Sequence, residues 1–270
     1  MPESFALNID WSGLWTWFLF FVRFGGVLSS LPGIGTEEVP MTTRVSLSMI
    51  LSAISAFTGI HAAVPDSALA GAGMLAVEFI YGYLIGAVPF YIVASLAVAG
   101  QVTAATIGLG QATMIDPSIG EPVSVLSRFQ SFVAVSVFLA IDGHHAVLRA
   151  AMEPPGGMGL GVFRPNADVA MILVERMSHT FELAVTISGP ILVAVLLAQF
   201  VLGLLTKFVP QVNVFIISLP LTIGLGMFIL GGTLPTFRDH FIREFNATEE
   251  IIGKIVGAGT RPPADPPQTP

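Results

Sequence analysis

The stretch MLAVEFIYGYLIGAVPFYIVASLAVA, Met74 to Ala99, decides the class of fold. It carries a single charge, Glu78, and it is long and apolar enough to form a helix that crosses a bilayer. Pro89 also lies inside the run and interrupts its helical hydrogen bonding. Charge at membrane depth and an interrupted helix both require protein or water as neighbours. The stretch therefore predicts a helix packed inside a membrane assembly.

The whole chain shares this apolar character. Its 270 residues are 53% hydrophobic and 11% charged, and the mean hydropathy is +0.81, whereas a soluble domain carries about 25% charged residues. We therefore predict an integral membrane protein. The net charge of −7, with no run of Lys or Arg, argues against nucleic acid as a partner. Because cysteine is absent, the chain has no disulfide, thiolate metal site or cysteine nucleophile.

Six apolar windows follow one another along the chain. The first contains Arg23, the second is short, and the fourth carries Arg128 near its start, so these three are the weaker span predictions. Pro89, Pro190 and Pro220 each interrupt a window and tend to kink its helix. We predict an all-α, membrane-associated fold of about six long apolar helices in kinked hairpins. The windows are Trp11 to Leu31, Leu47 to Ile60, Met74 to Ala99, Val123 to Ile141, Leu183 to Leu205 and Val214 to Leu234.

The connections between windows differ in kind. TKFVPQVN, Thr206 to Asn213, is short enough to force an antiparallel helical hairpin. Prolines and glycines exclude a continuous helix from Glu153 to Asp168, and we expect a flexible loop there. The following segment, Val169 to Glu182, gathers polar side chains on one helical face, which needs water or protein as its neighbour.

The C-terminal part is less apolar than the windows. Beyond Pro235, the segment TFRDHFIREFNATEEIIGKIVG is predicted to form an amphipathic helix. The final TRPPADPPQTP, Thr260 to Pro270, contains too much proline for a packed structure, so we expect a disordered tail.

Motifs of enzyme chemistry are absent from the sequence. It has no HExxH, GxSxG, GxxxxGK[ST] or zinc-ligand spacing. We therefore predict no enzyme activity, no cofactor and no metal. The stretch DGHHAVL leaves two interpretations open: Asp142, His144 and His145 bind a metal or relay protons, or they form a helix boundary at the turn-like Asp-Gly.

The stretch GLGQATMIDPSIGEP, Gly108 to Pro122, interrupts two apolar windows. Its glycines permit positive φ, and Met114 with Ile115 offers a deformable apolar tip. Pro117 pushes Asp116 toward extended geometry. These properties suit a movable plug, but they also suit a plain water-exposed loop, which the residues taken alone favour.

Three blocks of sequence together resemble the FliR family of flagellar export-gate proteins, whose counterpart in injectisomes is the T subunit. They are GQVTAATIGLGQATMIDPS, DGHHAVLRA and LLTKFVPQVNVFIISLPLTIGLG. RFGGVLSSLPGIGTEEVPMTTRVSLSMIL also resembles the start of the family, and the resemblance extends from about Trp11 to Phe237. One departure is Asp142, where the family commonly has Asn before Gly-His-His.

The resemblance implies a structural and gating subunit of the flagellar type III protein export channel. It implies a helical hetero-oligomer with FliP-like and FliQ-like subunits and an FlhB-like protein, through which unfolded flagellar proteins pass. The apolar surface would pack on these subunits and on membrane lipid, in the bacterial inner membrane at the flagellar basal body. Residues 1–240 would form the export-gate domain, with a FliP-like part at 1–165 and a FliQ-like hairpin at 166–240, and residues 241–270 the amphipathic segment and tail.

The resemblance also implies roles for individual residues. The loop after the third window is expected to plug the channel, with two glycines as its hinge. Other residues are expected to shape the hairpin turn or to make buried polar contacts inside the assembly. The plug is Gly108, Gly110, Met114, Ile115, Asp116 and Pro117, the hairpin turn is Pro210, Gln211 and Asn213, and the polar contacts are Glu78 and Arg128.

Two alternatives belong to other classes of protein. A small secondary transporter would use Glu78 as an intramembrane carboxylate that couples ions to a solute, but its sequence mark, an inverted repeat, is not visible. An intramembrane enzyme would need convergent polar residues at matched depth. Glu78 and the turn from Asp142 to His145 are too few for such a site.

Overall fold

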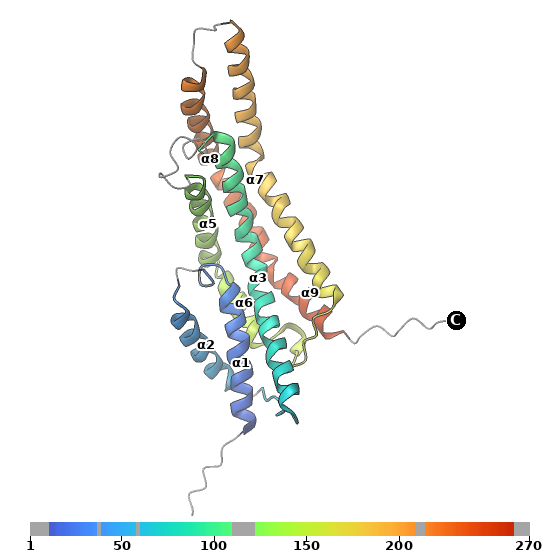
Figure 1. Cartoon of the computed structure of the whole chain (residues 1–270). Helices are drawn as coiled ribbons and strands as arrows, with labels where there is room; N and C mark the ends of the chain where they lie inside the picture. Colours follow the sequence, from blue (N-terminus) through green and yellow to red (C-terminus); the bar gives the residue numbers. More distant parts are fainter. Residues whose placement is uncertain (1–10, 37–38, 58–59, 110–121, 209–213, 262–270) are drawn as a thin grey trace, which may run out of the picture. The chain divides into compact units, whose positions relative to one another are not determined.

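The structure is a computed structural model that describes residues 11–36, 39–57, 60–109, 122–208 and 214–261. Within these residues all regular structure is helical, which confirms the predicted all-α class. The elements are α1 (Trp11–Ser30), α2 (Met41–Ala56), α3 (Ala68–Ile107), α5 (Pro122–Ala140), α6 (Gly143–Met152), the short 3₁₀ helix η2 (Pro155–Gly157), α7 (Ala167–Phe208), α8 (Val214–Asn246) and α9 (Thr248–Thr260) (Figure 1).

Membrane-spanning potential is concentrated in the long helices. Among the described residues, α3, α7 and the segment Ile216–Thr260 are each long and apolar enough to cross a bilayer. A fourth span is possible if α5 and α6, which bend by 63° at their junction, are counted as one. The windows of α1, α2 and α5 are the three that the sequence marked as weaker, and none of these helices passes as a span by itself.

Prolines lie inside the long helices without ending them. Pro89 is inside α3, Pro190 inside α7, and Pro220 and Pro235 inside α8. Each removes one backbone donor, but the helix continues on both sides. As a result the predicted polar segment and the apolar window after it form the single 42-residue helix α7. The helix predicted beyond Pro235 is present as the end of α8 and as α9.

Contacts divide the chain into two compact units that interleave in sequence. Unit 1 consists of Met1–Pro89, His144–Leu173 and Thr248–Pro270, and unit 2 of Phe90–Gly143 and Val174–Ala247. The helices α3 and α7 contribute residues to both units. Each unit therefore has a core of its own, built from segments far apart in the sequence.

In unit 1, α1 and α3 pack with their backbones in close approach. Gly82 and Gly86 lie one turn apart on α3, the spacing of small residues that lets membrane helices approach closely. A Cβ added to Gly82 would lie 2.0 Å from the carbonyl oxygen of Arg23, and one added to Gly86 would lie 2.7 Å from that of Val27. Only glycine fits at these two positions of the contact.

The short helix α2 packs on α1 and is apolar on its outside. Its buried side chains are Ser48, Ser52 and Ser55, and the hydroxyl of each donates to a carbonyl of the same helix. Its exposed side chains include Ile50 and Ile54. Small residues inside and large apolar residues outside are typical of a helix that meets lipid or another protein.

The core of unit 2 joins four helices. It is formed by apolar side chains of α3, α5, α7 and α8. These side chains are Ala104, Ile107, Leu126, Ile191, Val195 and Leu230. Because Ile191 and Val195 of α7 meet Leu230 of α8 here, the two helices run side by side along their apolar middles.

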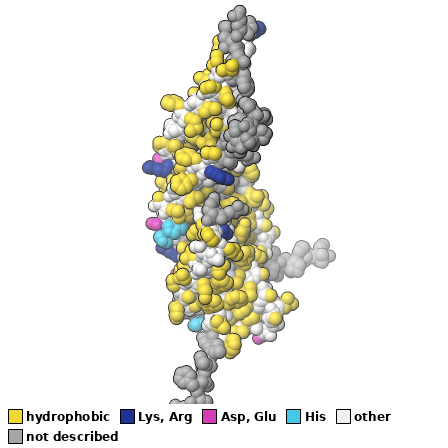
Figure 2. Space-filling model, turned by 60° about the vertical axis from the view of Figure 1, so that its left-hand side comes forward, with side chains coloured by type: hydrophobic (Ala, Val, Ile, Leu, Met, Phe, Trp, Pro, Cys, Tyr) yellow, Lys and Arg dark blue, Asp and Glu magenta, His cyan; other side chains and the backbone are white. Residues whose placement is uncertain are grey.

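Much of the protein surface is also apolar. Figure 2 shows hydrophobic side chains over much of the face in view, with few charged side chains, some of them grouped near one edge. The exposed large hydrophobic residues are concentrated on α7 and α8, where only 17% of the most apolar window of each spanning segment is buried. A monomeric soluble protein does not expose apolar surface on this scale.

The contact between α1 and α3 predicts a large effect of one methyl group. Gly82→Ala should lower the free energy of unfolding by about 1–3 kcal/mol, because the new Cβ forces the two backbones apart. Gly73→Ala is the matched control, since a Cβ there has no atom within 4 Å and the gain in helix propensity is up to about 1 kcal/mol. Thermal denaturation in detergent measures both, and equal midpoints for the two variants would contradict the close packing.

Candidate functional site

A fully buried ion pair lies in unit 1. Nε of Arg23, on α1, donates to Oε2 of Glu78, on α3, at 2.5 Å, and the two side chains are 1% and 0% exposed. The other carboxylate oxygen, Oε1, accepts the backbone N–H of Gly161 in the loop before α7. Both oxygens of Glu78 are therefore engaged.

Arg23 makes further contacts that hold α6 in place. Its Nη1 donates to the carbonyl oxygen of Ala151 at 2.9 Å. The guanidinium also lies 5.5 Å from the ring centroid of Phe20 and 4.8 Å from that of Tyr81, a cation–π arrangement. The hydroxyl of Tyr81 donates to the carbonyl of Ala150 at 2.9 Å. The pair thus connects α1, α3, α6 and the loop before α7.

Sequence reasoning noted both charges but did not pair them. Arg23 weakened the first span prediction, and Glu78 was assigned a polar contact inside the assembly. The signal that could have joined them is that each is an isolated charge of opposite sign in an otherwise apolar window, and buried charges are found paired. Arg128, the other predicted polar contact, is exposed on α5 of this chain, so its contact in an assembly stays a prediction.

Hydrogen bonds from Asn166 and from the backbone N–H of Arg164 join α9 to the segment before α7. Oδ1 of Asn166 accepts the N–H of Val169 at 3.0 Å, which caps the start of α7. Its Nδ2 donates to the carbonyl of Ala258, on α9, at 2.8 Å. The buried face of α9 is apolar, with Ile252 and Ile255 at 1% exposure or less. The helices α1 and α9 therefore belong to the same compact unit.

In unit 2, the predicted plug begins at a well-formed helix end. Gly108 has φ of +92° and ends α3 in a Schellman motif, in which its N–H donates to the carbonyl of Ala105 and that of Leu109 to Ala104. The carbonyl of Ile107 accepts the hydroxyl of Thr222 from α8 at 3.0 Å.

The near end of the loop is thus fixed to the core of unit 2. The remaining plug residues, Gly110, Met114, Ile115, Asp116 and Pro117, lie outside the described residues.

The hairpin of α7 and α8 is antiparallel, as predicted. Nε2 of His179, early in α7, lies 3.1 Å from Oε2 of Glu244, late in α8, whereas the middles of the two helices meet at the unit 2 core. The polar face predicted for Val169 to Glu182 therefore meets protein at His179. The turn residues Pro210, Gln211 and Asn213 fall in the segment that the structure does not describe.

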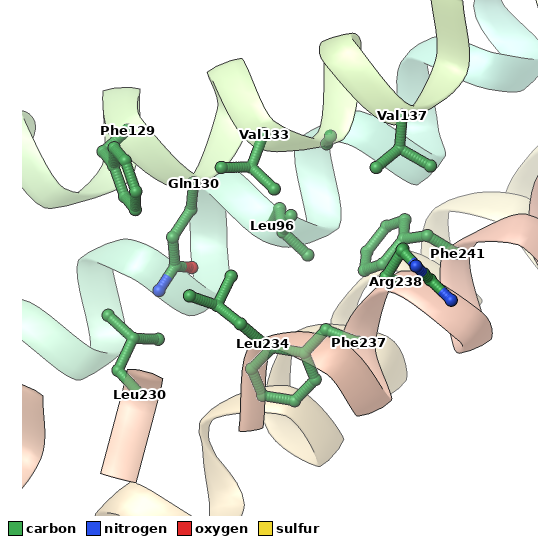
Figure 3. Close-up of a pocket in the computed structure, with 11 residues that line it drawn as sticks. Leu96, Phe129, Gln130, Val133, Val137, Leu230, Leu234, Phe237, Arg238 and Phe241 are labelled. Carbon is green, nitrogen blue, oxygen red and sulfur yellow. The ribbon is translucent and has the colours of Figure 1, made fainter. Parts of the chain in front are cut away.

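A small cavity between α3, α5 and α8 holds a buried amide (Figure 3). Its volume is about 20 Å³, and its lining includes Leu96, Val133 and Leu234. Gln130 points into it, and neither atom of the amide has a hydrogen-bond partner among the described residues. A space of this size admits about one water molecule and no larger ligand.

The stretch DGHHAVL forms a helix boundary. α5 ends at Ala140, α6 begins at Gly143, and Asp142 between them has φ of +58°. Its N–H donates to the carbonyl of Leu139 at 3.2 Å. Asp and Asn both adopt the left-handed conformation more readily than other residues. Asp142, in place of the Asn that is common before Gly-His-His, therefore preserves the turn.

Comparison with known proteins gives a consistent result. Residues 14–248 match the family described as bacterial export proteins, family 1. The chain is 27% identical over 218 residues to the flagellar biosynthetic protein FliR of Caulobacter vibrioides, covering 80% of this chain and 87% of the relative. It is 24% identical to that of Escherichia coli over 92% and 95% of the two chains, and 26% identical to that of Aquifex aeolicus over 88% and 93%.

The Arg23–Glu78 pair predicts non-additive mutant effects. Glu78→Leu alone should lower the free energy of unfolding by about 3–5 kcal/mol, because it leaves a buried guanidinium without a counter-charge. The double variant Arg23→Met with Glu78→Leu should be more stable than Glu78→Leu, since it removes both charges. Thermal midpoints of the two single variants and the double variant in detergent measure this coupling. Simple addition of the two single effects would show that the charges do not act as a pair.

Proposed function

This chain belongs to the FliR family of bacterial export proteins, and we propose that it is a structural and gating subunit of the flagellar type III protein export channel. It would act in the bacterial inner membrane, at the flagellar basal body. The match over residues 14–248 and the relatives named flagellar biosynthetic protein FliR support this role.

The exposed apolar face of α7 is the main observation that supports an assembly with other subunits. Large exposed hydrophobic side chains follow one another from Val174 to Phe208, a length of about 50 Å at 1.5 Å per residue. A bilayer core is about 30 Å thick, and helix tilt reaches only about 40°. Lipid therefore covers only part of this face. Charged residues such as Glu175 and Glu182 stand beside the exposed apolar side chains, which favours protein over lipid at that end.

We infer that the remaining apolar surface packs on other export-gate subunits, FliP-like and FliQ-like, and that an FlhB-like protein also binds. The FliP-like part would be residues 1–165 and the FliQ-like hairpin residues 166–240, with residues 241–270 beyond this export-gate domain. Helices in such a gate would associate through shape complementarity and apolar contact area. The helix α2 fits this type of packing, because its serines are buried against the chain and Ile50 and Ile54 are exposed to a partner.

Gating would be passive and would use the loop after α3. Its start is fixed by the Schellman motif at Gly108 and the hydrogen bond from Thr222, and it leads into α5 at Pro122. A loop with such an anchor can present Met114 and Ile115 to a channel for unfolded flagellar proteins and withdraw them. No covalent step is needed for this role.

The geometry does not favour the secondary transporter. A coupling carboxylate has to exchange its ion during transport. Both oxygens of Glu78 are instead occupied by Arg23 and Gly161, at full burial. Its contacts are those of a residue that holds helices together.

The assembly proposal predicts a stable complex. Co-expression with FliP-like and FliQ-like proteins should give one species after detergent purification, because the partners cover the exposed face of α7. A single cysteine at Phe200, 66% exposed, should crosslink to a partner subunit. Ser188→Cys on the same helix is the matched control and should not crosslink, since Ser188 is fully buried. A well-folded monomer that ignores both partners would overturn the proposal.

The gating proposal is tested separately in the same cysteine-free background. Met114→Cys and Ile115→Cys should crosslink to a stalled export substrate or to a pore-facing residue of a partner, because the loop tip would lie in the channel. Phe57→Cys, exposed on unit 1, is the control for non-specific labelling. If neither loop position reaches a substrate or a partner while the complex is intact, the plug assignment is wrong and the assembly proposal stands.

A further inference from the structure

Three side chains at the start of α6 bring metal-ligand atoms together. Asp142, His144 and His145 each offer one such atom, and the three atoms lie within 4.8 Å of one another. The rings of the two histidines are adjacent, with centroids 4.1 Å apart. Successive residues of a regular helix point about 100° apart, so the spacing of these residues in the sequence did not predict that their side chains converge.

The turn before α6 brings the carboxylate to the histidines. Asp142 has φ of +58°, and its N–H donates to the carbonyl of Leu139 at 3.2 Å, so its backbone is held in the left-handed conformation just before the helix. A Cβ added to the next residue, Gly143, would lie 2.5 Å from the ring of Phe138. The turn is therefore closely packed, and the backbone fixes where the carboxylate starts.

Two imidazoles and one carboxylate form a ligand set that suits a divalent transition metal. Zinc binds histidine nitrogen and carboxylate oxygen at about 2.0–2.2 Å in tetrahedral geometry, and an open site has three protein ligands with water as the fourth. Ligand atoms around such an ion are about 3.5 Å apart, so modest rotamer changes bring the three atoms from the observed limit of 4.8 Å to one ion. Magnesium and calcium prefer oxygen ligands only, which argues against them here.

The three ligands are accessible in this chain. Asp142 and His145 are exposed and His144 is half-buried, so an ion can reach them and retain a water molecule. Because the chain has no cysteine, no thiolate elsewhere competes for zinc. The other three histidines belong to no comparable group of three ligands within the part of the chain that the structure describes.

We propose that Asp142, His144 and His145 bind one zinc ion. The turn supplies the carboxylate oxygen, the first turn of α6 supplies two imidazole nitrogens, and water supplies the fourth ligand. The ion connects the turn to the helix and stabilises the start of α6. This proposal replaces the expectation of no metal, which depended on the absence of the usual zinc-ligand spacings, and it is independent of the gating role of the loop after α3.

Zinc binding to the purified full chain tests the proposal. The protein is prepared in detergent without a histidine tag, stripped of metal with a chelator and titrated with zinc, and the wild-type chain should bind one ion. Asp142→Asn should weaken binding about 100-fold, because even the loss of an outer hydrogen-bond partner of a ligand costs about 10–100-fold. Asn also adopts the left-handed conformation, so this variant removes the carboxylate and keeps the turn.

A histidine variant and a matched control complete the experiment. His145→Gln, at an exposed position, should weaken zinc binding as strongly as Asp142→Asn. The control combines His179→Gln with His240→Gln, which removes two histidines near Glu244 and should keep the affinity. Zinc should also raise the thermal midpoint of the wild-type chain and of the control, but not that of Asp142→Asn, because an ion that binds the folded state stabilises it.

Three results would overturn the proposal. A wild-type chain that binds no zinc would show that the three side chains do not hold an ion. Affinity that is unchanged in both Asp142→Asn and His145→Gln would show that these residues are not ligands. Loss of zinc binding in the control alone would place the ion at the histidines of α7 and α8 instead. None of these results would alter the assembly or the gating proposal.

Discussion

Arg23 and Glu78 place two opposite charges in the interior, where their side chains are 1% and 0% exposed to solvent. Neither is tolerable there without the other, and even the pair needs the additional donors and acceptors that Gly161 and Ala151 provide. This requirement fixes α1, α3, α6 and the loop before α7 relative to one another more strictly than apolar packing does. Gly82 and Gly86 are needed as well, because they let the backbones of α1 and α3 approach closely enough for Arg23 to contact Glu78 and Ala151.

The rest of the protein differs from a soluble domain mainly in its surface, because its interior is also largely apolar. Some polar groups are buried, such as the serines of α2 and the amide of Gln130, and large apolar side chains are exposed on α7 and α8. Hydrophobic burial within the chain therefore supplies only part of the stability. In the proposed assembly the remainder would come from surfaces that lipid and other subunits cover.

The helices could be predicted from sequence because charge-free runs are a local property. Each of the six windows overlaps one helix, although the second extends past the end of α2 at Ala56, and the weak spans were those with an internal arginine or too few residues. The continuity of α7 and the pairing of Arg23 with Glu78 were not predicted, because both depend on contacts between distant segments. Proline and glycine residues in the sequence predicted the loop after α3 and the turn at Asp142. The spacing of apolar residues does not reveal that Thr222 fixes the start of that loop by a hydrogen bond to Ile107.

Interleaving of unit 1 has a consequence for biosynthesis. Arg23 is made 55 residues before Glu78 and 128 residues before Ala151, an interval of roughly ten seconds at the usual rate of translation. During that time its guanidinium must be solvated by water or by lipid headgroups. The last helix, α9, also belongs to this unit. A chain that is released before α9 is made therefore lacks part of the core of unit 1.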